Sequence, residues 1–334
     1  RAEAMPHPVP GELTHDESLR FLKSLADFGR PAPILVITGG DALMRPDLID
    51  LVDAARSTGL TAALAPSVTQ LLTDDRLAEL RRHGVKMASL SLDGASPRTH
   101  EGLRQVKGHF DETLAALERL RAHGFVVQVN TVVTVENVGE LPAVARIVRD
   151  YGAAVWEVFF LVQVGRGNGM AELTPAENED VCHFLWEASH YDFVVRTVEG
   201  PFFRRVVAER GQGAAAPTSP LYERLRRGLL DQLGQPTTGS KAQTKGTRDG
   251  RGIVFVSSTG NVYPAGFLPI RLGNVRDQTI AELYREHPLM LDLRAARFTG
   301  RCGRCEYATL CGGSRSRAFA ATGDPLGEDP ACGY

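Results

Sequence analysis

A regular alternation of two kinds of segment runs from Pro33 to about Val198 and limits the folds open to this chain. Short apolar segments rich in β-branched residues are separated by amphipathic segments, as in successive βα units. Strands joined through helices pair in parallel, so the pattern predicts an α/β protein with a six-stranded parallel sheet. Periodicity leaves open whether that sheet is doubly wound or curled into a barrel. The expected strands are Ile34–Thr38, Thr61–Ala65, Lys86–Leu92, Val126–Val133, Val155–Val164 and Phe193–Thr197.

Helix-start signals fall outside the expected strands. Thr14 with Glu17, and Thr174 with Glu177, have the spacing of a capping box. Pro46 is expected at the first position of another helix. The amphipathic segments that follow these signals supply apolar faces to cover the sheet.

The composition is that of an ordinary globular protein. The 334 residues are 43% hydrophobic and carry a formal net charge of −2, so no basic surplus favours a nucleic-acid partner. Apolar runs such as Val155–Val164, interrupted by Glu157 and Gln163, are shorter than the roughly 20 residues of a membrane span. We therefore expect neither nucleic acid nor membrane as a partner, and no signal-peptide pattern opens the chain.

The regularity ends between Gly211 and Gly252, where two stretches rich in Gly, Pro and small polar residues flank one helical segment. A hairpin is expected after this stretch, with its turn at Thr259-Gly260. We interpret the stretch as a domain boundary or a mobile bridge. The predicted parts are a barrel or sheet domain over residues 1–211, a linker with one helix over residues 212–252, and a small C-terminal domain over residues 253–334.

Four of the five cysteines lie in the last part, with the spacing Cys302-x2-Cys305-x5-Cys311-x20-Cys332. Four thiolates that include one CxxC suit a tetrahedral zinc ion or a [4Fe–4S] cluster, and spacing does not choose between them. A zinc knuckle that only fixes the C-terminus is the structural alternative. Such clustering is unlike a secreted disulfide framework and favours a reducing, cytoplasmic location.

Polar residues and glycines follow several expected strands, at the edge where barrel folds bind ligands. In Thr38-Gly39-Gly40-Asp41 the glycines let backbone groups approach a ligand closely, and Asp41 can receive an ammonium group. Ser91-Leu92-Asp93-Gly94 leaves another strand, Asn130 lies on the next, and Gly165-Arg166-Gly167 ends the one after. Each motif alone also suits a tight turn, a cap or a surface ion pair.

Together these motifs resemble the radical S-adenosylmethionine (SAM) superfamily with a C-terminal SPASM or twitch extension, over nearly the whole chain. The resemblance implies a partial (β/α)6 TIM-like barrel followed by a small iron–sulfur domain. Gly39-Gly40-Asp41 is similar to the family's GGE motif, which contacts the amino group of SAM, with Asp in place of Glu. Ser91 matches the serine of the family's SLDG strand end. By the same resemblance the remaining SAM-site residues are Ser67, Asn130 and Arg166, and the ligands of an auxiliary [4Fe–4S] cluster are Cys302, Cys305, Cys311 and Cys332.

The family's CxxxCxxC motif, which holds the [4Fe–4S] cluster that cleaves SAM, does not occur in these residues. In haem-type members this motif is followed by Arg-Ala-x-Ala, and the chain opens with Arg1-Ala2-Glu3-Ala4. We therefore expect the motif, its second cluster and the first strand upstream of Arg1.

The C-terminal stretch from Cys302 to Cys332 is similar to the radical enzymes of haem d1 and alternative haem synthesis. The resemblance implies an enzyme that generates a 5′-deoxyadenosyl radical, abstracts hydrogen, and oxidatively modifies or decarboxylates a tetrapyrrole. Flavodoxin, ferredoxin or a reductase would supply electrons. One alternative is a radical maturase of a ribosomally made peptide. Another, from a different class, is a degenerate metal-binding scaffold without activity.

Other chemically notable residues have simpler interpretations. Cys182 is expected to be a buried structural thiol on a helix. Arg315 and Arg317, beside the cysteines, are suited to substrate carboxylates, with solvated or structural roles as the alternative. Three histidines without metal-ligand spacing are expected at the surface or at helix ends: His123, His183 and His190.

Overall fold

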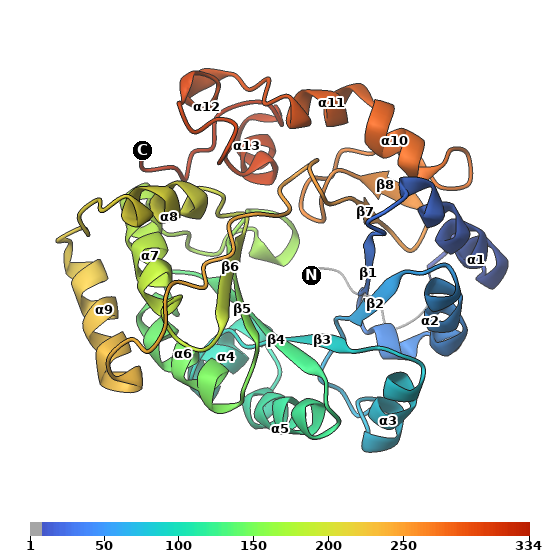
Figure 1. Cartoon of the computed structure of the whole chain (residues 1–334), viewed down its shortest axis with the longest axis horizontal. Helices are drawn as coiled ribbons and strands as arrows, with labels where there is room; N and C mark the ends of the chain where they lie inside the picture. Colours follow the sequence, from blue (N-terminus) through green and yellow to red (C-terminus); the bar gives the residue numbers. More distant parts are fainter. Residues whose placement is uncertain (1–8) are drawn as a thin grey trace.

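The computed structural model describes residues 9–334, so the Arg1-Ala2-Glu3-Ala4 motif lies outside the described residues. Six parallel strands form one sheet whose spatial order follows the chain, β1-β2-β3-β4-β5-β6. A doubly wound sheet reverses its order part-way, so this uninterrupted order indicates a curled partial barrel. Figure 1 shows the sheet curving with its helices on the outer side. The strands are β1 (Ile34–Ile37), β2 (Thr61–Leu64), β3 (Met87–Ser91), β4 (Val126–Val133), β5 (Val155–Phe160) and β6 (Val194–Val198).

Eight helices precede residue 212 in the described part of the chain. The capping boxes at Thr14 and Thr174 are confirmed. Pro46 lies before its helix instead of in it, because Asp47 forms the N-cap and its carboxylate is held by the Arg45 guanidinium at 2.6 Å. The helices are α1 (His15–Ser24), α2 (Leu48–Ser57), α3 (Asp74–Arg82), α4 (Pro97–Arg104), α5 (His109–Ala122), α6 (Leu141–Asp150), α7 (Pro175–Ala188) and α8 (Phe203–Gly211).

The two faces of each strand differ in character. On β4 and β5, Val127, Val129, Trp156 and Val158 are fully or almost fully buried and belong to the main apolar core. The residues between them point to the opposite, inner face and are only half-buried. The core therefore lies between the sheet and the outer helices, which leaves the inner face for polar side chains.

One histidine departs from expectation. His123 caps α5 and His190 follows α7, as predicted, but His183 is buried on α7. Its Nε2 lies 3.4 Å from Glu179 Oε1, and its ring packs edge-on against Tyr222. The prediction of an exposed His183 is wrong because a helix from the following segment covers this side of α7. Cys182 is fully buried on the same helix, as expected.

That covering helix is α9 (Pro220–Leu233), which packs against α6 and α7. After it, the backbone of residues 241–243 runs along β6, with Val195 donating to the Lys241 carbonyl and Gln243 donating to the Val195 carbonyl. Residues 212–252 are therefore attached to the sheet edge and its outer helices.

The C-terminal part contains a second, antiparallel sheet of three short strands, with the predicted hairpin turn at Thr259-Gly260. This part shares a second apolar core with α1 and α2, which includes Leu22, Leu51 and Met290. Figure 1 shows the hairpin and the first C-terminal helix beside α1. The elements are β7 (Phe255–Val256), β8 (Asn261–Tyr263), β9 (Gly273–Asn274), α10 (Ile280–Glu286), α11 (Pro288–Arg294), α12 (Gly300–Arg304) and α13 (Arg315–Thr322).

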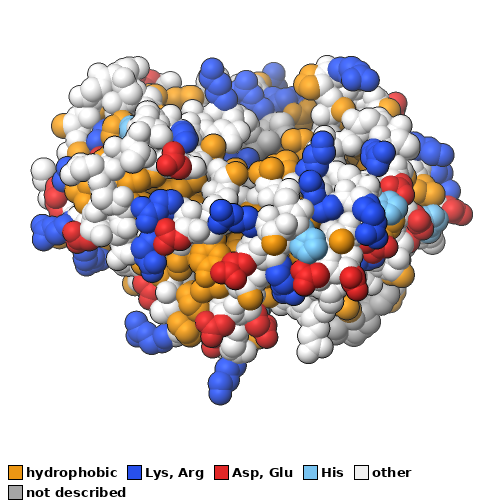
Figure 2. All heavy atoms as spheres, turned by 60° about the horizontal axis from the view of Figure 1, so that its bottom comes forward, with side chains coloured by type: hydrophobic (Ala, Val, Ile, Leu, Met, Phe, Trp, Pro, Cys, Tyr) orange, Lys and Arg blue, Asp and Glu red, His pale blue; other side chains and the backbone are white. Residues whose placement is uncertain are grey.

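Charges of both signs mix on the surface. On the face shown in Figure 2, Lys and Arg side chains lie among Asp and Glu side chains. Within residues 9–334, no helix combines the length and apolar character required to cross a membrane.

Candidate active site

The turn after β1 brings together four of the residues singled out from the sequence. The Ser67 hydroxyl, from the loop after β2, donates a hydrogen bond of 2.6 Å to the Gly40 carbonyl. Asp41 Oδ1 accepts from the Ser67 backbone N–H at 3.4 Å, and Asp41 Oδ2 accepts from the Thr69 hydroxyl at 2.7 Å. The carboxylate therefore ties two neighbouring loops together at the carboxyl edge of the sheet.

Gly39 gives this turn an open backbone. Its φ of +153° is a conformation that side-chain-bearing residues rarely adopt. Apart from Gly39 itself and its two chain neighbours, no described residue has an atom within 4 Å of the point where a Cβ would be. A ligand can therefore approach the Gly39 backbone, and a larger residue here would strain the turn.

A row of four polar residues crosses the inner face of the sheet. Ser91 on β3 is in register with Asn130 on β4, Asn130 with Glu157 on β5, and Glu157 with Arg196 on β6. Ser91 and Asn130 were predicted from the sequence, whereas Glu157 and Arg196 were not. The structure thus extends the predicted pair into a continuous polar row.

Hydrogen bonds within this row determine how Asn130 is oriented. Gln128 Oε1 accepts a hydrogen bond from Arg196 Nη2 at 2.5 Å. This contact fixes the orientation of the Gln128 amide, so its NH2 group is the one that faces Asn130 and Glu157. That Nε2 donates to Asn130 Oδ1 at 2.6 Å and to Glu157 Oε2 at 2.8 Å. Asn130 is left with its own NH2 group as a donor, which suits an oxygen-bearing ligand such as a hydroxyl or carboxylate.

The charged end of the row is an ion pair in a dry setting. Arg196 Nε lies 2.6 Å from Glu157 Oε1, and the Glu157 side chain is only 14% exposed. Burial raises the pKa of Glu157 above its ordinary value, although Arg196 acts in the opposite direction. Gln128 accepts one hydrogen bond from the Arg196 guanidinium, whereas the buried Nε pairs with Glu157 by charge and proximity without a hydrogen bond.

Asp93 and Arg166 complete the set of strand-end residues. Asp93 is buried, accepts from the Val132 N–H at 2.8 Å and pairs with Arg104 at 2.5 Å, so it fixes the loop after β3. Arg166 lies in a single 3-10 turn, Gly165–Gly167, shortly after β5. Its side chain is outside the part that the structure describes.

The four C-terminal cysteines are free of disulfides. Burial raises the pKa of Cys311 and of Cys332, and the nearby Cys302 thiol adds to both shifts. Cys305 directly follows α12. Within residues 9–334, no group of three or more His, Cys, Asp or Glu side chains is arranged to hold a metal ion.

Nitrogen donors point at the cysteine sulfurs. The Tyr307 N–H lies 3.4 Å from Cys305 Sγ, the Gly313 N–H 3.4 Å from Cys311 Sγ, and Arg315 Nη2 3.6 Å from Cys302 Sγ. Such contacts stabilise negative charge on sulfur and tune iron–sulfur clusters. Gly313 has a φ of +65°, and a Cβ there would come within 3.1 Å of Cys302 Sγ. The close approach of this loop to the sulfur therefore requires glycine.

Arg315 and Arg317 have structural roles, which was one of the two alternatives that the sequence left open, and they are not placed to meet substrate carboxylates. Arg315 is buried, stacks over the Phe298 ring at 4.4 Å and donates to the Gly327 carbonyl at 2.5 Å. Arg317 is also buried, with Nη1 3.1 Å from Asp329 Oδ1. The N–H groups of both arginines already bond to backbone carbonyls and to Asp329, because the C-terminal loop folds back over the two side chains.

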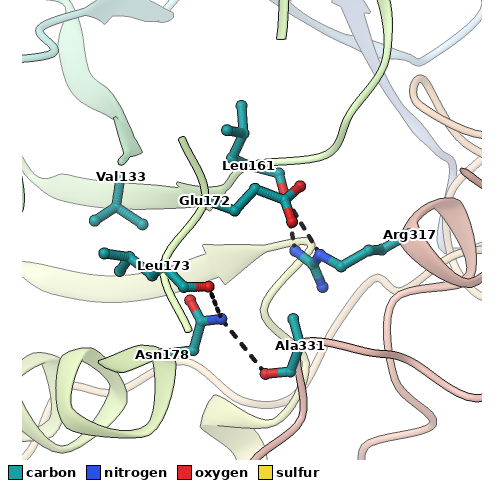
Figure 3. Close-up of a pocket in the computed structure, with 7 residues that line it drawn as sticks. All are labelled: Val133, Leu161, Glu172, Leu173, Asn178, Arg317 and Ala331. Carbon is teal, nitrogen blue, oxygen red and sulfur yellow. Dashed lines mark hydrogen bonds between the residues drawn. The ribbon is translucent and has the colours of Figure 1, made fainter. Parts of the chain in front are cut away.

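A cavity of about 10 Å³ lies at the seam between the barrel and the C-terminal tail, next to Arg317. Figure 3 shows the Arg317 guanidinium directed at the Leu161 carbonyl and Asn178 bridging Leu173 and Ala331. This volume holds at most about one water molecule. The cavity is a packing feature of the seam and is too small for a nucleotide.

Comparison with known proteins identifies the fold and its chemistry. Residues 3–148 match the family described as the radical SAM superfamily. The AdoMet-dependent heme synthase of Methanosarcina barkeri is 36% identical over 97% of this chain and 88% of its own length. The chain belongs to the radical SAM superfamily. It is therefore an enzyme, which excludes the scaffold alternative, and its family uses SAM and a [4Fe–4S] cluster.

Two further similarities are consistent with this. The pre-heme d1 synthase of Dinoroseobacter shibae is 28% identical over 97% of this chain and 79% of its own length. The solved structure of native anSMEcpe with bound AdoMet and Kp18Cys peptide has a TM-score of 0.66 and 17% identity, and the match covers 96% of this chain and 86% of that one. At 17% identity the likeness to this solved structure concerns the fold alone. That fold is the predicted partial barrel.

Three inner-face residues of this radical SAM enzyme were not predicted from the sequence as part of the site: Gln128, Glu157 and Arg196. A signal was present, because β5 carries Glu157 inside an otherwise apolar run, Val155–Phe160. A charged residue in a strand that is buried on its outer face must point to the interior of the barrel.

Proposed function

We propose that this radical SAM enzyme oxidatively modifies a tetrapyrrole, with loss of a propionate carboxylate as the favoured reaction. The observation that carries the proposal is the 36% identity to a protein named AdoMet-dependent heme synthase, over 97% of this chain. A match of that extent includes both the barrel and the cysteine-bearing tail.

We propose that the chain is divided as its sequence predicts. Residues 1–211 form the barrel domain, residues 212–252 the linker, and residues 253–334 the cluster domain.

We assign the SAM site to the carboxyl edge of the sheet. Gly39, Gly40 and Asp41 would hold the amino group of SAM, because the backbone is open at Gly39 and Asp41 supplies negative charge. Ser67 keeps the Gly40 carbonyl in place through its 2.6 Å hydrogen bond. The donors for the ribose or carboxylate would be Ser91, Asn130 and Arg166. When bound, SAM and a reduced cluster supply a 5′-deoxyadenosyl radical that removes hydrogen from the substrate.

We assign an auxiliary [4Fe–4S] cluster to Cys302, Cys305, Cys311 and Cys332. The donor set supports a cluster, because four free thiols lie in one loop region and three sulfurs have N–H groups directed at them. A second [4Fe–4S] cluster, on a CxxxCxxC motif upstream of Arg1, would act on SAM. Flavodoxin or ferredoxin would supply the electrons.

The test is an anaerobic incubation of the protein, expressed in full and reconstituted with iron and sulfide, with SAM, reductant and iron coproporphyrin. Mass spectrometry should detect 5′-deoxyadenosine and a porphyrin of lower mass. Asp41→Ala should abolish both products, whereas Asp53→Ala, on the outer side of α2, should retain them. Release of 5′-deoxyadenosine with no change in porphyrin mass would contradict the tetrapyrrole assignment and favour a peptide substrate.

A further inference from the structure

The inner face of the sheet carries an apolar wall next to the charged end of the polar row. Phe159 lies two residues beyond Glu157 on β5 and is in register with Val198 on β6. The ring of Phe267, from the C-terminal part, meets Phe159 edge to face with centroids 6.3 Å apart. Two distant segments therefore form this aromatic wall, at the carboxyl end of the strands that bear Glu157 and Arg196.

Arg196 is held in place but keeps free capacity. Glu157 Oε1 lies 2.6 Å from Nε as an ion pair and Gln128 accepts a hydrogen bond from Nη2, so the guanidinium is oriented before any ligand arrives. The Arg196 side chain is 32% exposed, in contrast to 14% for Glu157. Among the described residues only Nη2 donates a hydrogen bond, so the Nη1 group remains for another acceptor. A fixed, partly dry guanidinium matches a carboxylate in both geometry and charge.

We propose that Arg196 binds a carboxylate of the substrate while Phe159 and Phe267 contact the substrate's apolar body. The ligand class is a flat apolar molecule with carboxylate side chains, so the inference rests on the proposed function and names the substrate contact within it. Asn130 and Ser91 occupy the other end of the same row. The row thus places the SAM donors on β3 and β4 and the substrate carboxylate site on β6, with β5 between them.

Glu157 does not prevent this binding. Both of its carboxylate oxygens already have partners, because Oε1 pairs with Arg196 Nε at 2.6 Å and Oε2 accepts from Gln128 Nε2 at 2.8 Å. Glu157 also fixes the position of the Arg196 guanidinium on the inner face of the sheet. We therefore treat Glu157 and Gln128 as positioning residues and Arg196 as the contact residue.

The test compares two probes, iron coproporphyrin and its tetramethyl ester, titrated by absorbance against the reconstituted protein without reductant. The wild type should bind the acid more tightly than the ester. The double variant Glu157→Gln with Arg196→Gln removes both charges together, which avoids an unpaired buried charge. It should weaken binding of the acid about 10- to 100-fold, as expected for a hydrogen-bonded charge, and leave ester binding unchanged.

The matched control is the double variant Arg146→Gln with Asp150→Asn, which removes an ion pair on the outer side of α6. This variant should bind both probes as the wild type does. A double variant at the inner pair that keeps the full preference for the acid would overturn the role of Arg196 and leave the proposed function standing. A wild type that binds neither porphyrin would overturn the proposed function itself. Should the double variant fail to fold by circular dichroism, Arg196→Lys supplies the test: unchanged preference for the acid would again overturn the role.

Discussion

Glu199 and Asp249 place two carboxyl groups in the interior where β6 ends against α13. The Ser316 hydroxyl lies 2.8 Å from Glu199 Oε1 and 3.2 Å from Asp249 Oδ2, and the Ser314 hydroxyl also donates to Glu199. Burial raises the pKa of Glu199 to about 8, and the nearby Asp249 charge adds to the shift. Burial also raises the pKa of Asp249. Near neutral pH this pair therefore retains a proton.

This retained proton predicts a pH-dependent stability. Between the ordinary pKa of 4.5 and about 8, the folded protein holds a proton on Glu199 that the unfolded chain has released. The free energy of unfolding should therefore fall as pH rises through this window, by at most about 1.4 kcal/mol per pH unit, and level off above it. Urea unfolding at several pH values measures the slope. Glu199→Gln should flatten it, and an equal slope in this variant would contradict the assignment.

At the scale of elements, β5 illustrates both what local pattern predicts and where it stops. Its alternation is visible in the sequence, but the strand ends at Phe160 instead of Val164. The Leu161 carbonyl accepts from the Arg317 guanidinium at 3.0 Å, so the backbone leaves the sheet to meet the C-terminal helix. An acceptor used by a residue so distant in sequence cannot be anticipated from local hydrophobic pattern.

The contact between β5 and α7 depends on Trp156. Its side chain is fully buried, Nε1 donates to the Thr131 hydroxyl at 3.0 Å, and Phe184 packs against it edge-on. Trp156→Ala should lower the free energy of unfolding by about 3–5 kcal/mol, because it leaves a large cavity. The second tryptophan, Trp186, is half-buried near the end of α7 and is the matched control. Urea unfolding of Trp186→Ala should show a clearly smaller loss, and equal losses would contradict this account.

At the scale of the whole molecule, the C-terminal part contacts the barrel at several places, and two of these lie on either side of the segment that carries Cys302, Cys305 and Cys311. The Arg276 guanidinium, after β9, pairs with Glu17 on α1 at 2.6 Å and lowers the pKa of that carboxyl to about 2. On the other side Asn178, on α7, donates to the Ala331 carbonyl at 3.4 Å. Cys302, Cys305 and Cys311 lie between these attachments in the chain and Cys332 directly follows the second, so the position of the cysteines relative to the barrel is held from both sides.

The auxiliary cluster is testable through metal content. Replacing Cys305 by Ala should remove about four irons and the matching sulfide per chain, because each cysteine of the proposed set binds the cluster. Cys182→Ala is the control, since this fifth cysteine is fully buried on α7 outside the proposed ligand set. Iron and sulfide analysis with electron paramagnetic resonance gives the measurement. A colourless wild-type protein with one zinc per chain would instead support a zinc knuckle.

The sequence by itself determined the parallel βα architecture, the glycine turn at Gly39-Gly40 and the cysteine set. Each of these is encoded over short stretches: side chains alternate with a period of two along a strand, a turn needs glycine at one position, and cysteine spacing is counted along the chain. The register of one strand against the next is not encoded in this way.

Only the tertiary structure decided which polar residues share a site. Glu157 and Arg196 join Asn130 because three strands align, and that alignment follows from packing between the sheet and its helices. The same holds for burial of Arg315 and Arg317, whose partners are distant carbonyls and Asp329. Whether a charged side chain meets ligand, solvent or its own chain depends on segments far away in sequence, and that information exists only once the chain has folded.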